Sequence, residues 1–330
     1  GAGFAAADQL ALELGFDGDD ARRVEAGVIF ELRHNLTNGH TFLPQDKLVA
    51  ATSQLLSLEA EPVIAAVDRL TELGRVEHST IAGIAAVYLP EYYEAETAIA
   101  ARIRAMAQHP PAPLPDAERV LQGIEAIAGI TYAERQRDAI RMAAERRIMI
   151  LTGGPGTGKT TVLSGILTLF SKLGRKTLLA APTGRAAKRL SELTGRDAAT
   201  VHRLLEAQVS PENGKMFFAR NEDEPLECDA VIVDEMSMVD VLLMHSLLEA
   251  LPQEACLVLV GDPDQLPSVG AGNLFSDLIR SGIVPSVCLT EIFRQARQSL
   301  IVMNAHAVNR GELPVLTAKD RDCFFLRRRA

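Results

Sequence analysis

One eight-residue stretch limits what this chain can fold into more than any other. Residues 153–160 read Gly-Gly-Pro-Gly-Thr-Gly-Lys-Thr, which satisfies the pattern G-x-x-x-x-G-K-[ST]. An apolar run at 148–151 precedes it, and a helical pattern begins near Thr160. In such a setting the glycines let backbone N–H groups surround a phosphate at the positive end of the helix. The sequence therefore predicts a phosphate-binding loop in an α/β domain, and a glycine-rich turn without function is the weaker alternative.

The residues of this loop have separate expected tasks. Lys159 is expected to neutralise β- and γ-phosphate oxygens, and the hydroxyl of Thr160 to bind Mg²⁺. The full set predicted to bind the nucleotide is Gly154, Pro155, Gly156, Thr157, Gly158, Lys159, Thr160 and Thr161.

Two acids end a second apolar run, at 230–233. Asp234 is placed to hold the Mg²⁺ through water, and Glu235 to polarise the water that attacks the γ-phosphate. Acids at strand ends are often simple caps. After a phosphate loop, however, this pair indicates hydrolysis of a nucleotide rather than binding alone.

The order of apolar runs and breaks predicts how the chain is divided. Four prolines within residues 109–116 mark a linker, because proline is not tolerated in a helix interior or a central strand. Before it, residues 1–108 hold three amphipathic segments and two short β-rich pieces, which indicates a small, mainly helical, winged-helix-like domain. From 117 to 289, short apolar runs alternate with helical stretches, which is typical of a parallel sheet buried on both faces. The expected strands are 148–151, 177–180, 230–233, 257–260 and 286–289.

Composition and charge exclude several classes of protein. With 330 residues, 47% apolar and 23% charged, the chain is expected to be globular. Its four cysteines form no C-x-x-C pair, which argues against zinc and disulfide frameworks. No apolar run is long enough for a bilayer and the start lacks a signal pattern, so no membrane contact and a cytoplasmic location are expected. The net charge of −9 hides a basic segment, 151–210, with nine bases against three acids. This basic strip suggests contact with nucleic acid, and an ordinary solvated surface is the alternative.

Four further blocks follow in a fixed order. They are Ala-Pro-Thr-Gly-Arg-Ala-Ala at 181–187, Thr-Val-His-Arg-Leu-Leu at 200–205, Gly-Asp-Pro-Asp-Gln-Leu-Pro-Ser-Val-Gly at 261–270 and Leu-Thr-Glu-Ile-Phe-Arg-Gln at 289–295. With the phosphate loop and the acid pair, these blocks resemble the superfamily 1 helicases, and within them the RecD-like branch of superfamily 1B. The N-terminal part, whose residues 1–7 look like half of a helix-hairpin-helix element, resembles the extended RecD type of bacteria that lack RecB and RecC. For residues 1–7 alone, a flexible terminus is an equal alternative.

The resemblance implies further residue roles around the nucleotide. Gln136 matches a glutamine that hydrogen-bonds adenine, Gln265 a residue that senses the γ-phosphate, and Arg294 an arginine finger. Without the family, Gln136 and Arg294 would be taken for surface residues. The phosphate loop would belong to a RecA-like motor domain, 117–289, and residues 290–330 would begin a second RecA-like domain that is incomplete here.

The resemblance also implies a path for single-stranded DNA. The residues that match DNA-contacting positions are Pro182, Thr183, Arg185, Thr200, His202, Ser268 and Val269. The basic residues between them, Arg189 included, are expected to add a positive field. Asn213-Gly214 predicts a tight hairpin within 208–226. In RecD-like enzymes a hairpin inserted here acts as the pin that splits the duplex, and Phe217 or Phe218 would contact a base. A surface hairpin without that role is the alternative.

The resemblance thus implies an ATP- and Mg²⁺-dependent DNA helicase of repair and recombination, with single-stranded DNA stimulating its ATPase. It would move 5′ to 3′ and split duplexes at junctions with single strands. No obligatory protein partner is indicated, and a monomer is compatible with the sequence. Two alternatives stay open, an ATP-switched clamp on a nucleic-acid strand that does not unwind, and an ATPase that acts on a protein.

Overall fold

The computed structural model describes residues 3–211, 214–292, 298–316 and 322–323. Arg294 and Asn213 lie outside these residues. The chain forms two compact units, one of residues 1–100, 240–245 and 268–273, and one of residues 101–239, 246–267 and 274–330. In the described part of the chain, no helix is both long and apolar enough to cross a membrane.

The first unit is a small helical domain with a three-stranded sheet. Its elements are α1 (Phe4–Glu13), α2 (Ala21–Leu36), β1 (Phe42–Pro44), α3 (Gln45–Leu56), α4 (Ala60–Glu72), β2 (Glu77–Ile81), β3 (Ile84–Tyr88) and the start of α5 (Pro90–Gln108). The sheet has the order β1-β3-β2 and is antiparallel throughout. Val28, Leu48 and Val67 meet in its core, because α2, α3 and α4 each turn one apolar stripe inward.

Two segments from far along the sequence belong to this first unit. The Gly272 amide donates to the Gly39 carbonyl at 3.0 Å. A Cβ at Gly272 would lie 2.4 Å from Val241 and 3.4 Å from Thr41, so the segments approach closely at this glycine. The block at 261–270 therefore divides between the two units after Pro267.

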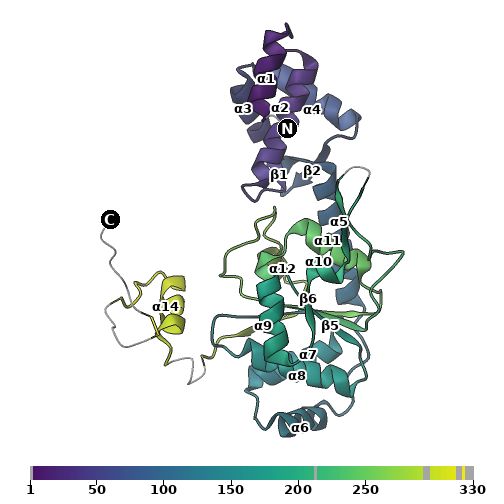
Figure 1. The fold of residues 1–330 in the computed structure, drawn as a ribbon, viewed down its shortest axis with the longest axis vertical. Coiled ribbons are helices and arrows are strands. Elements are labelled where there is room, and N and C mark those ends of the chain that lie inside the picture. The colour runs from purple at the N-terminus through teal and green to yellow at the C-terminus, as the bar shows by residue number, and fades with distance from the viewer. Residues whose placement is uncertain (1–2, 212–213, 293–297, 317–321, 324–330) are drawn as a thin grey trace. The chain divides into compact units, whose positions relative to one another are not determined.

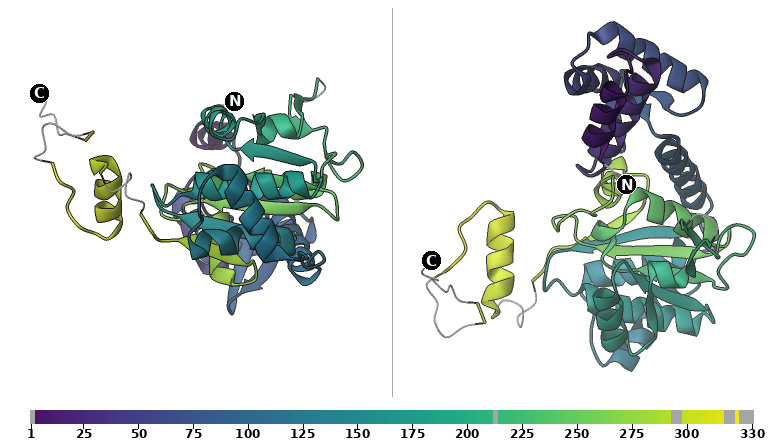
Figure 2. Two further views of the ribbon diagram at one scale, coloured as in Figure 1. Left: turned by 90° about the horizontal axis from the view of Figure 1, so that it is seen from below. Right: turned by 45° about the horizontal axis from the view of Figure 1, so that its top comes forward.

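The second unit is the predicted α/β domain (Figures 1 and 2). Its strands are β4 (Ile148–Gly153), β5 (Thr177–Ala181), β6 (Ala198–Thr200), β9 (Ala230–Val233), β10 (Cys256–Gly261) and β11 (Ser286–Leu289). They form one parallel sheet in the order β11-β4-β10-β9-β5-β6. Every residue of β4, β9 and β10 is buried, which explains why these strands are continuous apolar runs.

Helices cover both faces of this sheet. In chain order, the described helices after α5 are α6 (Ala117–Ala128), α7 (Glu134–Glu145), α8 (Lys159–Lys172), α9 (Gly184–Thr194), α10 (Val201–Leu204), η1 (Met236–Met238), α11 (Val241–Ala250), α12 (Leu274–Ser281) and α14 (Leu300–Asn309). On the face covered by α6, α7 and α8, the side chains of Met149, Ile232 and Val258 join Ile140 and Phe170 in one core. A short hairpin of β7 (Ala207–Val209) and β8 (Met216–Phe218) lies between α10 and β9 in the chain.

The strand order decides where functional residues gather. Since β4, β5, β9 and β10 are parallel, their carboxyl ends meet at one edge of the sheet. The loops that follow these strands carry the phosphate loop, the 181–187 block, the acid pair and residues 261–267, the part of the 261–270 block that belongs to this unit. The fold therefore brings four sequence blocks to a single edge.

Candidate functional site

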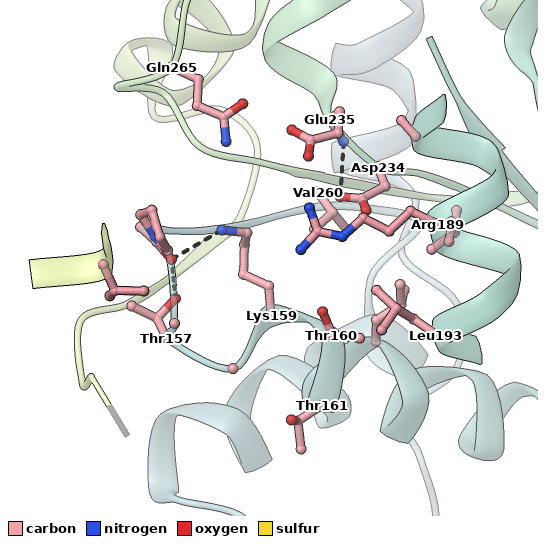
Figure 3. A pocket seen from close by; sticks show the side chains of 18 residues that line it. Thr157, Lys159, Thr160, Thr161, Arg189, Leu193, Asp234, Glu235, Val260 and Gln265 are labelled. Carbon is pink, nitrogen blue, oxygen red and sulfur yellow. Dashed lines mark hydrogen bonds between the residues drawn. The ribbon is translucent and has the colours of Figure 1, made fainter. Parts of the chain in front are cut away.

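A cavity of about 870 Å³ opens at this edge of the sheet (Figure 3). Its walls come from the phosphate loop and the start of α8, from one face of α9, from the ends of β9 and β10, and from α14. The lining residues are Gly154, Pro155, Gly156, Thr157, Gly158, Lys159, Thr160, Thr161, Leu163, Ala186, Arg189, Leu190, Leu193, Asp234, Glu235, Val260, Gln265 and Val302. All eight residues predicted for the phosphate loop therefore lie around one space.

The loop backbone has the curvature that its glycines allow. Gly156 and Gly158 have φ angles of 75° and 87°, in the left-handed region that L side chains rarely adopt. Gly158 directly precedes the first residue of α8, so the amides at the positive end of that helix border the cavity. The Thr157 hydroxyl donates to the Gly154 carbonyl at 2.8 Å and fixes the turn.

Lys159 folds its ammonium back onto the loop. Its Nζ donates to the carbonyls of Gly153 and, at 3.2 Å, of Gly154. Burial lowers the pKa of Lys159, while the nearby carboxylates of Asp262 and Asp234 oppose that shift. A phosphate group would give this desolvated cation a stronger acceptor than the two carbonyls.

The acid pair faces the loop from the end of β9. The Glu235 amide donates to Asp234 Oδ1 at 2.9 Å, and Glu235 itself has a φ of 55°, unusual for a residue with a side chain. Burial is the main cause that raises the pKa of both carboxyls, and the charge of Lys159 opposes it. Carboxyl groups whose pKa values are shifted by burial and by a charged neighbour are typical of functional sites.

The residues present fit a magnesium ion bound with a nucleotide. Mg²⁺ binds one or two carboxylates together with substrate phosphates and several waters. The Thr160 hydroxyl and the Asp234 carboxylate line the same cavity and supply that small set. Among the described residues no group of three or more His, Cys, Asp or Glu could hold a metal.

The two glutamines occupy different surroundings. Gln265 is exposed and lines the cavity, on the loop after β10. Gln136 is 4% exposed and is not among the lining residues. Its Oε1 accepts from the Ala133 amide at 3.1 Å, whereas its Nε2 is buried without a hydrogen-bond partner in the described structure. A buried amide nitrogen of this kind is normally paired, so the two N–H donors of Gln136 Nε2 are available to a ligand.

The predicted DNA contacts at β5 and β6 lie at helix starts. Thr183 caps α9, with its hydroxyl oxygen accepting from the Ala186 amide at 3.2 Å. Thr200 caps α10 in the same way, accepting from the Arg203 amide at 3.1 Å. Both hydroxyls are half-buried and still have a proton to donate. Pro182 is half-buried and Arg185 exposed beside Thr183, so the end of β5 is accessible to a ligand.

His202 contacts the hairpin. Its ring lies 5.8 Å from the ring of Phe218, at an interplanar angle of 55°. Phe217 points to solvent with 46% of its surface exposed, next to Met216 at 56% and Val209 at 67%. The structure therefore separates the two phenylalanines, since Phe218 packs on His202 and Phe217 belongs to an exposed apolar strip.

Ser268 and Val269 belong to the first unit. The Ser268 hydroxyl donates to the carbonyls of Gly270 at 2.9 Å and Gly272 at 3.2 Å. Val269 is 95% exposed, which is unusual for an apolar residue held in such a turn.

Sequence reasoning did not find every residue of the cavity. It grouped Arg189 with the DNA-facing strip, but Arg189 lines the cavity with Ala186, Leu190 and Leu193. The spacing i, i+3, i+4, i+7 was the available signal, because it defines one helix face. In α14, His306 hydrogen-bonds through Nε2 to the Pro155 carbonyl at 2.9 Å, and no sequence motif pointed to it.

Comparisons with known proteins show what this chain is similar to. A family model for an AAA domain matches residues 136–271, and a model for the "ATP-dependent RecD2 DNA helicase HHH domain" matches residues 1–42. The ATP-dependent RecD2 DNA helicase of Deinococcus radiodurans is 37% identical over 324 residues, which is 95% of this chain and 44% of that protein.

Shorter matches reach proteins named as RecD subunits. The RecBCD enzyme subunit RecD of Mycolicibacterium smegmatis is 37% identical over 58% of this chain and 37% of its own length. That of Mycobacterium tuberculosis is 33% identical over 68% of this chain and 42% of its own length. The chain thus spans less than half the length of these curated relatives.

Proposed function

Because this chain belongs to the RecD-like helicases, of the type with an extended N-terminal region, we propose that the protein is an ATP-driven helicase that moves along single-stranded DNA. One observation carries the proposal, namely that Lys159, Asp234, Glu235 and Gln265 line one cavity at the carboxyl edge of a parallel sheet. These side chains are the ones that hydrolysis of a nucleoside triphosphate requires.

Each side chain has a task in hydrolysis that its position supports. The amides at the start of α8 hold the β-phosphate, and Lys159 moves from the loop carbonyls to the phosphate oxygens. Thr160 and Asp234 would hold Mg²⁺, which supplies charge neutralisation on the phosphates. Glu235 orients the attacking water. For Gln136, which does not line the cavity, the unpaired side-chain amide is what supports its proposed role as a donor to the adenine ring.

The DNA path follows from the loops at the same edge. Thr183 and Thr200, each at a helix start, bind the phosphate backbone together with Pro182, Arg185 and His202. Ser268 and Val269, which belong to the first unit, are further DNA contacts in our proposal. Gln265, on the loop just before Ser268, senses the γ-phosphate and links the cavity to the strand. Hydrolysis then changes the grip on DNA, which is how a motor of this type moves.

Several further features belong to this proposal. The protein moves along the strand from 5′ to 3′ and prefers junctions between duplex and single-stranded DNA. It acts as a monomer in the cytoplasm, where its DNA substrate is. Residues 109–116 link an N-terminal domain, 1–108, to the motor domain, 117–289. Residues 290–330 begin the second motor domain, with Arg294 as its arginine finger.

The test combines an ATPase assay with a strand-displacement assay on the full-length protein. We expect single-stranded DNA to stimulate hydrolysis strongly, and a duplex with a 5′ tail to be unwound faster than one with a 3′ tail. Lys159→Ala and Glu235→Gln should abolish both activities. DNA-stimulated ATPase without unwinding of either substrate would show an ATP-switched clamp instead of a helicase. ATPase that DNA does not stimulate would indicate an enzyme that acts on another partner.

The exposed hairpin gives a second test. In our proposal Phe217 stacks on a base at the point where the duplex splits, while Phe218 is held by His202. Phe217→Ala, or a two-residue turn in place of residues 210–215, should slow strand separation and leave DNA-stimulated ATPase intact. Met216→Ala, on the same exposed strand, is the matched control for loss of apolar surface. Normal unwinding by the shortened hairpin would rule out a pin.

A further inference from the structure

Helix α9 turns one of its faces into the nucleotide cavity. Ala186, Arg189, Leu190 and Leu193 line the cavity, and they follow one another at helical spacing. Lys188 lies on the opposite, exposed face, where its Nζ is 3.9 Å from Glu192. The two adjacent cations of α9 therefore have different surroundings, and only Arg189 belongs to the cavity wall.

Arg189 faces the acid pair across open space. Figure 3 shows its guanidinium beside Asp234 and below Glu235, and in this view the guanidinium lies between Asp234 and the ammonium of Lys159. In the described part of the chain the guanidinium has neither a hydrogen-bond partner nor a carboxylate at ion-pair distance, and the residue is exposed. Five N–H donors thus point toward a cavity in which the protein supplies no acceptor close enough to use them.

A phosphate group is the ligand that would pair with the free guanidinium of Arg189. A guanidinium binds phosphate oxygens in a two-pronged way that an ammonium cannot reproduce. The amides at the start of α8 surround the β-phosphate position, whereas the acid pair marks where water attacks the γ-phosphate. Arg189 lies on the acid-pair side of the cavity, so the phosphate within its reach is the terminal one.

We propose that Arg189 binds the γ-phosphate of ATP from within the same domain that carries the phosphate loop, and so makes the site prefer ATP over ADP. This inference rests on the proposed function, because it requires ATP to occupy the cavity. It assigns Arg189 to the nucleotide and removes it from the set of basic residues that attract DNA.

The experiment compares affinities for a non-hydrolysable fluorescent ATP analogue and for the matching ADP analogue, measured on the full-length protein without DNA. Arg189→Ala should weaken binding of the ATP analogue about ten- to a hundredfold, the range for a lost hydrogen bond to a charged group. Binding of the ADP analogue should change less than about threefold on the same reasoning, since ADP lacks the phosphate concerned. Arg189→Lys should recover part of the loss, because it keeps the charge without the planar fork.

Two controls keep the outcome interpretable. Arg141→Ala removes the same charge from an exposed position on α7, where Arg141 pairs with Asp138 at 2.9 Å, and it should leave both affinities unchanged. Lys159→Ala should lose both nucleotides. If the wild-type protein binds neither analogue, the proposed function fails before Arg189 is tested.

The ratio of the two affinities decides the proposal, since it cancels any general loss of folded protein. An unchanged ratio in Arg189→Ala would overturn it, whether both affinities fall together or neither falls. A loss of affinity for single-stranded DNA without nucleotide, with the ratio kept, would return Arg189 to the DNA path. A reduced ratio with unchanged DNA affinity is the expected result.

Discussion

The packing of the phosphate-loop helix gives a prediction with a definite sign. Gly165 lies in the middle of α8, where α8 crosses α7. A Cβ there would be 2.5 Å from Ile140 Cδ1 and 2.8 Å from the Tyr132 hydroxyl, closer than real atoms approach. Ile140 is fully buried and Tyr132 is 4% exposed, so neither side chain has free space to move into.

Two opposing contributions set the size of the effect of Gly165→Ala. Alanine favours a helix interior over glycine by about 0.5–1 kcal/mol. Overpacking a filled core costs about 1–3 kcal/mol. We therefore expect a net destabilisation of about 1–2 kcal/mol, which lowers the melting temperature by about 2–8 °C in a domain of this size. Pushing α7 away from α8 would also displace Gln136 and weaken nucleotide binding.

Thermal unfolding followed by circular dichroism measures this effect, and Gly123→Ala is the matched control. Gly123 lies inside α6, and the nearest atom to its Cβ would be the mobile Lys172 Nζ at 3.4 Å. Here the helix preference acts alone, so the control should be more stable than the wild type by up to about 1 kcal/mol. If Gly165→Ala also melted at or above the wild-type temperature, the close contact between α7 and α8 would be refuted.

Three further predictions concern single side chains. The side chain of Arg23 is 7% exposed and pairs with Asp8 at 2.7 Å. Arg23→Ala should lower the free energy of unfolding by about 3 kcal/mol and speed amide exchange in α1 but not in α8. Equal changes of exchange in the two helices would refute this prediction. Hydrogen bonds from the side chain and the backbone of Arg22 lower the pKa of Asp20, the cap of α2, to about 2. Because the pKa of Asp20 is lower in the folded than in the unfolded state, Asp20 stabilises α2 fully above about pH 4 and loses this effect as the pH falls through about 2. Asp20→Ala should lack this pH dependence of stability, which acid unfolding measures. Burial raises the pKa of Cys228 to about 11, so iodoacetamide at pH 8 should label exposed Cys288 first, as peptide mass spectrometry would show.

Much of the nucleotide site was predictable because its parts are local. The phosphate loop needs glycines at left-handed positions and a helix start directly after them, and both requirements appear in the sequence as Gly156, Gly158 and Lys159. The acid pair needs a buried strand that ends at Asp234. Such runs of consecutive residues predict the same local geometry in any fold whose strands are parallel.

The surroundings of a side chain are not local, and there the sequence was insufficient. Charge alone placed Arg189 with the DNA-facing bases, although the geometry of α9 turns it into the cavity. Nothing in the chain distinguished Phe217 from Phe218 before the ring of His202 was seen against the second. Arg294 lies outside the described residues, and its role stays a prediction.

The sequence by itself determined the chemistry at the carboxyl edge of the sheet. Consecutive residues are enough to set the backbone conformation of a phosphate loop and the end of a buried strand. Only the tertiary structure decided which neighbours those residues have. It joined residues 268–273 to the first unit through Gly272, and it set α14 against the phosphate loop through His306. Such contacts depend on where separate elements pack, and packing between distant segments leaves no periodic trace in the chain.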